Sequence, residues 1–310
     1  MAADLPNLAR FDYVDRINLA IDHAVRNLAE PLRLADLASA AAFSPYHFHR
    51  IFSALMGETV LTFVKRVRLE RALFLMSHRR DLSFTQVAQA CGFTSSSDFS
   101  RSFRARYGVS PRGLDIDRFR SQRRADLLQT LEPQERHRLR SPAPGGDPAE
   151  FTVRLRRVPG RRVAYIRVFR PYDGGVPAAA ERLVAWAQAR GLADGQWLGY
   201  QWEDPETVPP ELCRYDVGLE VPPDRTGDGE VSMTTFPAMT LAEVDVAGTI
   251  DDELRVLRWL YQTWLPASGF VPAHQPCFEA WHGRPFAGDG GEIRLRVQLP
   301  VVAPGARFHT

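Results

Sequence analysis

Apolar positions in the first 130 residues recur at helical spacing. Val14, Ile17, Ile21 and Val25 lie three or four residues apart, which predicts an amphipathic helix near the start of the chain. Further along, the run TVLTFVKRVRLERALFLM predicts one long amphipathic helix. The first part of the chain is therefore expected to be an all-α domain.

The pattern changes after residue 150. The runs FTVRLRRV, RRVAYIRVF, YDVGLEV and EIRLRVQL alternate between apolar and polar residues, which predicts strands. Between the two patterns, EPQERHRLRSPAPGGDPAE has few apolar residues and many Pro, Gly and charged residues, so it predicts a linker. We therefore expect an all-α domain over residues 1–131, a linker over 132–150 and an α+β domain over 151–310.

Both predicted domains repeat internally. In the first, residues 34–43 match residues 84–93 at an offset of 50, and one extra residue then shifts the offset to 51. Each copy predicts a short helix, a tight connection and a second helix, which is a helix-turn-helix unit. In the second domain a constant offset of 78 aligns, for example, Trp186 with Trp264, and predicts two copies of a strand–helix–strand–strand unit.

Composition narrows the class of protein. With 45% hydrophobic and 25% charged residues, the 310-residue chain is typical of globular proteins. The N-terminus has no apolar core, which argues against a signal peptide, and the longest uncharged run contains three prolines, which argues against a membrane span. Three widely spaced cysteines suggest neither disulfides nor zinc and favour a cytoplasmic location.

Charge is distributed unevenly between the two domains. Residues 1–124 hold 19 Arg and Lys against 12 Asp and Glu, whereas residues 151–310 hold 17 against 20. A basic first domain favours a polyanionic partner, although a solvated surface also explains such an excess.

The first domain resembles the DNA-binding domain of AraC/XylS-type regulators over about residues 15–115. The resemblance rests on LADLASAAAFSPYHFHRIFSALMG, VKRVRLERALFLM and VAQACGFTSSSDFSRSFRARYGVSP. It implies double-stranded DNA as a partner and RNA polymerase as a further one. By position, the family's base-reading residues fall on Tyr46, His49, Arg50, Ser96, Ser97, Ser100 and Arg101, and we expect Arg104 to contact phosphate. Surface ion pairs are the alternative role for the arginines, and a merely solvated side chain is the alternative for His49.

The second domain lacks a nucleophile elbow, an H-E-x-x-H motif, a P-loop and a dinucleotide glycine pattern, so no catalytic residue, metal or cofactor is expected. It is rich in Trp and Tyr. Tyr200 and Trp202 share one face of a predicted strand, as Glu279 and Trp281 do on the equivalent strand. The repeat aligns Glu279 with the neutral Gln201. Glu279 is therefore either an exposed edge residue or a carboxylate in a pocket.

Residues 151–303 also look like the GyrI-like effector-binding domain, through RRVAYIRV, RYDVGLEVP, CFEAWHG and EIRLRVQLP. The resemblance implies a small-molecule pocket in which the family's glutamate falls on Glu279. We expect ligand contacts from Glu279, Trp281, Tyr200, Trp202 and Tyr165.

Together the two resemblances predict a one-component transcription regulator that senses a cationic or amphipathic compound, including drugs. Two alternatives stay open at this point. One is a GyrI-like hydrolase of small molecules fused to a DNA-binding domain. The other is a constitutive DNA-binding protein whose second domain only contacts partners.

Overall fold

The computed structural model describes residues 6–130, 150–286 and 292–303. The chain divides into two compact units, whose main segments are Met1–Phe119 in the first and Arg120–Thr226 with Met233–His309 in the second. The division falls within helix α7 (Ile116–Thr130), ahead of the predicted linker. All of that linker except Glu150 lies outside the described residues.

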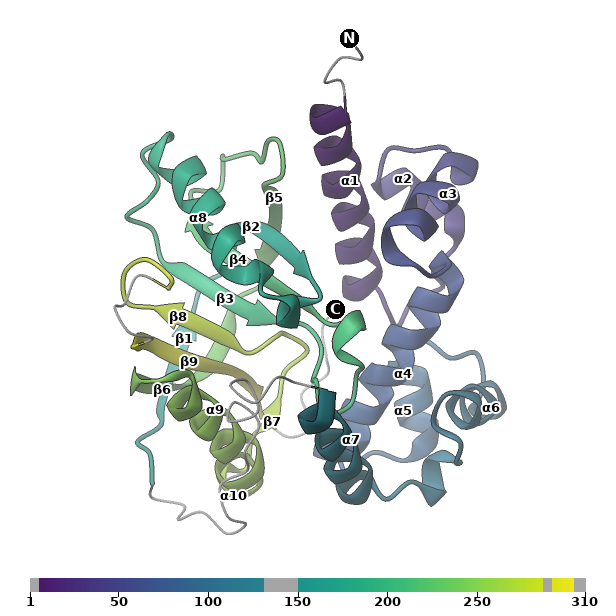
Figure 1. Ribbon diagram of the computed structural model, residues 1–310. Coiled ribbons are helices and arrows are strands. Elements are labelled where there is room, and N and C mark those ends of the chain that lie inside the picture. Colours follow the sequence, from purple (N-terminus) through teal and green to yellow (C-terminus); the bar gives the residue numbers. More distant parts are fainter. Residues whose placement is uncertain (1–5, 131–149, 287–291, 304–310) are drawn as a thin grey trace. The chain divides into compact units, whose positions relative to one another are not determined.

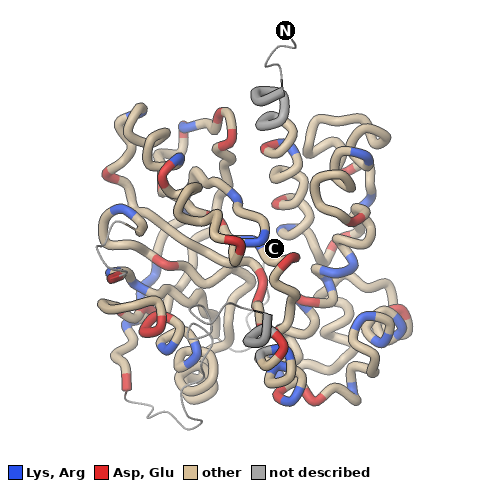
Figure 2. Tube along the Cα trace, in the orientation of Figure 1, with Lys and Arg blue, Asp and Glu red and all other residues tan. Residues whose placement is uncertain are grey.

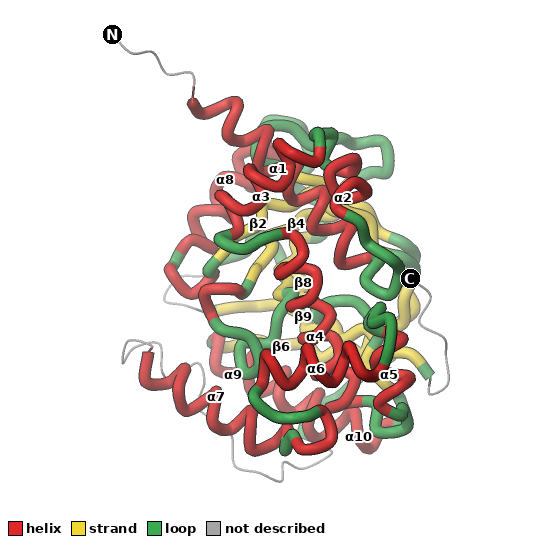
Figure 3. The backbone as a smooth tube through the Cα atoms, turned by 90° about the vertical axis from the view of Figure 1, so that its right-hand side faces the viewer, coloured by secondary structure: helices red, strands yellow, loops and turns green. Residues whose placement is uncertain are grey.

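The first unit is built from helices, as Figures 1 and 3 show. Its helices are α1 (Pro6–Arg26), α2 (Leu34–Ala40), α3 (Pro45–Met56), α4 (Val60–His78), α5 (Phe84–Ala90) and α6 (Ser96–Tyr107), followed by a 3-10 turn at Pro111–Gly113. The pairs α2–α3 and α5–α6 confirm the two predicted helix-turn-helix units, and α4 is the predicted long helix between them. In the part of the chain that the structure describes, no helix is both long and apolar enough to cross a membrane.

The second helix of each helix-turn-helix unit, α3 or α6, begins and ends in the same way. The hydroxyl of Ser44 accepts a hydrogen bond from a backbone N–H in the first turn of α3, and Ser95 does the same for α6. The helices end at Gly57 and Gly108, whose φ angles of 69° and 78° lie in the left-handed region that favours glycine. Equivalent caps, 51 residues apart, fix equivalent starting points for the two exposed faces.

Phenylalanines on the inner face of these helices form the core. Phe48, Phe52, Phe99 and Phe103 are all at most 2% exposed. The ring centroids of Phe52 and Phe63 lie 5.4 Å apart at a steep angle, an arrangement that aromatic rings favour. Because the phenylalanines on the inner faces of α3 and α6 form the core contacts, the residues on the outer faces of these helices are not needed for packing.

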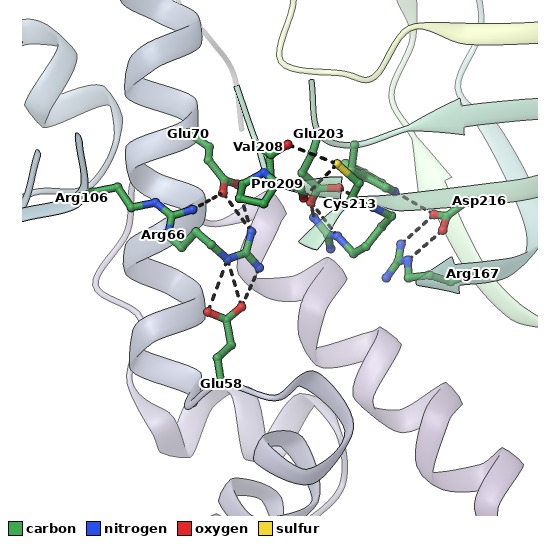
Figure 4. Close-up of polar contacts among 12 residues, drawn as sticks. Glu58, Arg66, Glu70, Arg106, Arg167, Glu203, Val208, Pro209, Cys213 and Asp216 are labelled. Atoms are coloured by element: carbon green, nitrogen blue, oxygen red, sulfur yellow. Dashed lines mark hydrogen bonds and ion pairs between the residues drawn. The ribbon is translucent and has the colours of Figure 1, made fainter. Parts of the chain in front are cut away.

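A buried arginine fixes the connection between the two helix-turn-helix units. The Arg66 guanidinium of α4 lies 2.6 Å from a carboxylate oxygen of Glu58, before α4, and 3.0 Å from one of Glu70 (Figure 4). Arg106 of α6 approaches the same Glu70 carboxylate at 3.9 Å. The cluster therefore joins the end of the first helix-turn-helix unit, the long helix α4 and the second helix-turn-helix unit.

The second unit is a mixed helix and strand domain. Its strands are β1 (Arg154–Val158), β2 (Arg161–Phe169), β3 (Trp197–Gln201), β4 (Arg214–Val221), β5 (Ser232–Phe236), β6 (Met239–Gly248), β7 (Val271–Pro272), β8 (Phe278–Trp281) and β9 (Ile293–Val302). Its helices are α8 (Gly175–Gln188), α9 (Ile250–Trp259), a π-helical segment Leu260–Trp264 and α10 (Leu265–Ser268). The strands form one antiparallel sheet in the order β1-β6-β9-β8-β3-β4-β2-β5, with β7 beside β9.

The sheet confirms the predicted repeat. The copies are β2-α8-β3-β4 and β6-α9-β8-β9, and antiparallel pairing of β3 with β8 joins them. Helices α8 and α9 cover the same face of the sheet (Figure 1). The opposite face packs an apolar cluster that includes Val163, Tyr165, Tyr200, Phe236 and Phe278. The sheet thus has one helix-covered face and one aromatic face.

We expect Arg66→Met to destabilise the first unit by about 3 kcal/mol, because it removes the ion pairs of Arg66 with two largely buried carboxylates, Glu58 and Glu70. Urea unfolding of the full chain, followed by far-UV circular dichroism, measures the change. Lys65→Met on the exposed side of α4 is the matched control and should leave the transition in place. Equal midpoints for the two variants would contradict a structural role for the cluster.

Candidate nucleic-acid interface and effector site

The outer face of α3 presents the first group of predicted DNA-binding residues. Tyr46, His49 and Arg50 are all exposed, with Tyr46 at 66%. The Arg50 guanidinium donates a hydrogen bond to the Tyr46 hydroxyl at 3.1 Å and lies 5.7 Å from the ring centroid. The tyrosine therefore orients the Arg50 guanidinium with one hydrogen bond, and the other N–H donors of the guanidinium can bind a partner.

The outer face of α6 presents the second group. Ser96, Ser97, Ser100, Arg101 and Arg104 are exposed. Ser100, Arg101 and Arg104 line an open hollow together with Ala105. Figure 2 shows Lys and Arg positions along α3, α4 and α6.

A weak local contact restrains Arg101. Arg101 is 80% exposed and lies 3.1 Å from the Asp98 carboxylate in the first turn of α6. An exposed pair of this kind contributes little to stability, so a phosphate or base can displace it at low cost. All eight predicted DNA-binding residues thus lie on the exposed faces of the two equivalent helices, where arginine can bridge guanine acceptors and serine can reach phosphates.

Glu279 lies on the helix-covered face of the sheet, on β8. Its carboxylate accepts a 2.5 Å hydrogen bond from the hydroxyl of Tyr215 on β4. The strand between them is β3, whose Gly199 is the ladder partner of Glu279. The contact therefore spans a strand, and residues from both copies of the repeat build it.

Gly199 makes this contact geometrically allowed. A Cβ atom on Gly199 would lie 1.9 Å from the Tyr215 hydroxyl oxygen and 2.5 Å from a carboxylate oxygen of Glu279. Both distances are far below van der Waals contact. The absent side chain of Gly199 is thus the space in which the tyrosine and the glutamate meet.

A second carboxyl reaches the same place from α9. Glu253 is only 6% exposed. Burial and the nearby Glu279 raise the pKa of Glu253 well above its usual range. Burial raises the pKa of Glu279 to about 7, although the hydrogen bond from Tyr215 counteracts the shift. The site therefore holds a partly exposed carboxyl whose protonation changes near neutral pH.

The structure separates the five predicted ligand residues into two groups. Glu279 and Trp281 lie on the helix-covered face, whereas Tyr165, Tyr200 and Trp202 lie on the aromatic face. The physical reason is strand alternation, because Tyr200 follows Gly199 and so points to the opposite side of β3. Tyr165 and Tyr200 are fully buried in the apolar cluster. The fold therefore does not bring these three residues to Glu279.

Buried ion pairs hold the aromatic face in place. The Arg167 guanidinium binds the Asp216 carboxylate at 2.7 and 2.8 Å, and both side chains are fully buried (Figure 4). The indole N–H of Trp202 donates to the same carboxylate at 2.8 Å. Because the indole is fixed in this way, Trp202 is a structural neighbour of the ion pair.

Sequence reasoning missed three residues of the site, namely Gly199, Tyr215 and Glu253. One signal was present for Glu253, because the repeat aligns it with Gly175 and thus adds a carboxyl to one copy only. Among the described residues, no group of three His, Cys, Asp or Glu side chains is arranged to hold a metal ion.

Comparison with known families agrees with the geometry of the second unit. Residues 151–302 match the family described as the GyrI-like small molecule binding domain. A DNA gyrase inhibitor of Serratia proteamaculans is 36% identical over 133 residues, which cover 42% of this chain and 85% of that protein. The chain belongs to the GyrI-like family.

The first unit of this GyrI-like protein matches a second family. Residues 37–115 match the helix-turn-helix domain family. The probable transcriptional regulator LumQ of Photobacterium leiognathi is 37% identical over 100 residues, covering 32% of this chain but only 40% of that protein. A solved structure of the DNA-binding domain of AdpA in complex with a target DNA shows 29% identity and a TM-score of 0.32, covering 35% of this chain and 96% of that one. The chain thus joins an AraC-type helix-turn-helix domain to a GyrI-like domain, which makes it a DNA-binding transcription regulator with a small-molecule effector domain.

We expect Gly199→Ala to destabilise the second unit by about 1–3 kcal/mol, because the new methyl group forces Tyr215 and Glu279 apart. Thermal unfolding of the full chain measures the loss. Gly175→Ala is the control, since its Cβ would meet only a side-chain carbon of Val168 at 3.3 Å. A Gly199→Ala protein as stable as Gly175→Ala would argue against the tight contact.

Proposed function

We propose that this regulator reads an asymmetric DNA site as a single chain and that a cationic or amphipathic small molecule, bound beside Glu279, controls it. The proposal about the ligand rests on one observation. The carboxyl of Glu279 accepts a hydrogen bond from Tyr215 in the space that Gly199 leaves open. The exposed faces of α3 and α6 support the DNA half.

For DNA, we assign α3 and α6 to successive major grooves, about one helical turn of DNA apart. Arg50 and Arg101 are assigned to base edges, with Tyr46, His49, Ser96, Ser97 and Ser100 on neighbouring bases or phosphates, and Arg104 on a phosphate. Two non-identical helices on one chain would read two different half-sites. A palindrome is therefore not required.

For the ligand, the electrostatics favour a cation. An ionised carboxylate removed from water is unfavourable unless a counter-charge or strong hydrogen bonds compensate it. Glu279 has the Tyr215 hydroxyl as its donor and the acidic Glu253 as its neighbour. A lipophilic cation would supply the missing counter-charge and could also contact the indole of Trp281.

We propose binding rather than turnover for this domain. Its fusion to a DNA-binding domain supports a sensor, since occupancy alone then suffices for an output. We also propose RNA polymerase as a partner and the cytoplasm as the compartment. Three free cysteines support that compartment.

The DNA assignment is tested by comparing two arginines. Arg50→Ala should weaken operator binding by about 1–3 kcal/mol and relax the preference at one base position, whereas Arg104→Ala should weaken all sequences alike. The measurement is a binding titration against the operator and single-base variants, with Arg225→Ala in the other unit as the control. Arg50→Ala binding the operator as tightly as the wild type would remove Arg50 from base reading.

The ligand assignment is tested with Glu279→Gln, which keeps the shape and removes the charge. Its affinity for tetraphenylphosphonium should fall at least tenfold, while its affinity for the neutral triphenylphosphine oxide should change little. Calorimetric titration of the full chain measures both, and Glu181→Gln on the exposed side of α8 is the charge-matched control.

Equal losses for the two compounds would contradict recognition of charge by Glu279. Mass spectrometry after incubation with a lipophilic cation that carries an ester bond checks for turnover. A hydrolysed product formed by the wild type and not by Glu279→Gln would favour the hydrolase.

A further inference from the structure

The ligand site contains one carboxyl more than recognition of a single cation requires. We infer that Glu253 and Glu279 share a proton in the empty site and that a singly charged cation binds by displacing it. The inference rests on the proposed function of the site, since it describes how the same two carboxyls would take the ligand.

Helix capping does not account for the burial of Glu253. The first turn of α9 contains Asp251, Asp252 and Glu253, and the cap is made by Asp252, whose carboxylate accepts from the backbone N–H of Thr249 at 2.8 Å. Glu253 instead turns inward, and its Oε1 atom is buried without a hydrogen-bond partner. A buried carboxyl of this kind points to a function beyond the helix itself.

The surroundings of the two carboxyls supply donors but no cation. The groups that act on Glu279 are Tyr215 from β4, Trp281 from β8 and Glu253 from α9. The thiol of Cys277, the residue before β8, lies close enough for both carboxyls to raise its pKa. Among the described residues, neither glutamate forms an ion pair with an Arg, Lys or His side chain.

Two adjacent carboxyls in such a place cannot both ionise, because each charge disfavours the other in a medium of low polarity. One proton held between them relieves the repulsion and gives the second carboxyl a donor. The direction of both pKa values, upward for Glu253 and to about 7 for Glu279, agrees with this arrangement. Since the groups are coupled, the proton belongs to the pair rather than to either residue.

The other copy of the repeat shows that the fold does not need the pair. The residues equivalent to Glu253 and Glu279 are Gly175 and Gln201. Gln201 donates a hydrogen bond to the Tyr172 hydroxyl at 2.8 Å, so a neutral amide serves this strand position. The two carboxyls are therefore an addition to one copy, and their joint presence calls for a ligand-related reason.

Exchange of a proton for a cation has a measurable consequence. The cation and the proton compete for the same negative charge, so the affinity for a monocation should fall as the pH decreases below about 7, by up to tenfold per pH unit. A neutral ligand displaces no proton, and its affinity should stay nearly constant over the same range.

The experiment is calorimetric titration of the full chain with tetraphenylphosphonium at pH 6, where a site with a pKa of about 7 is almost fully protonated, repeated in buffers of different ionisation enthalpy. The buffer dependence of the heat gives the number of protons released. We expect about one proton per cation bound in the wild type and in the Glu181→Gln control. In Glu253→Gln the amide donates to Glu279, which then stays ionised, so proton release should be largely lost.

The outcomes separate this inference from the proposed function. Tight binding of the cation by the wild type without proton release overturns proton exchange and leaves the cation site standing. Equal proton release in the wild type and in Glu253→Gln removes Glu253 from the exchange. A wild-type protein that binds neither tetraphenylphosphonium nor other lipophilic cations overturns the proposed site, and the inference falls with it.

Discussion

Pairing of β3 with β8 joins the two copies of the repeat into one sheet, and everything at the effector site depends on that junction. The ladder places Gly199 opposite Glu279 and leaves room above the glycine for the Tyr215 hydroxyl. A larger residue at 199 would separate the tyrosine from the carboxylate. The site is thus a property of the junction, because neither copy alone contains both the carboxyl and its donor.

The DNA-binding unit follows a comparable division of labour. Phenylalanines on the inner faces of α3 and α6 supply the apolar burial, and serine and glycine caps define where each helix starts and stops. The outer faces are consequently free to carry polar residues chosen for a partner. The buried Arg66 cluster ties the two helix-turn-helix units together, as the proposed reading of one DNA molecule by both units requires.

Local signals explain why much of the fold could be predicted. The caps at Ser44 and Ser95 mark helix starts in the sequence, and the apolar run in RRVAYIRVF, rich in β-branched and aromatic residues, marks β2. Alternation also shows which residues share a face, as for Glu279 and Trp281. It does not show which face the helices cover, because that depends on how α8 and α9 pack.

The residues around Glu279 could not be predicted from the sequence for the same reason. Their aromatic side chains predict that Tyr200 and Trp202 contact the ligand together with Glu279, but both residues lie on the other face of the sheet. Glu253 sits among acidic residues at a helix start, where the sequence pattern indicates capping, so its inward turn could not be recognised from that pattern alone.

The two faces of the sheet differ in how freely they can change over evolution. The aromatic face combines interlocked rings with ion pairs that have no access to water, so a substitution there disturbs several partners at once. On the helix-covered face, an exchange at the ends of α9 or in β8 alters a few side chains around one carboxyl. Substitutions around Glu279 would therefore alter the proposed ligand preference while the aromatic face preserves the fold.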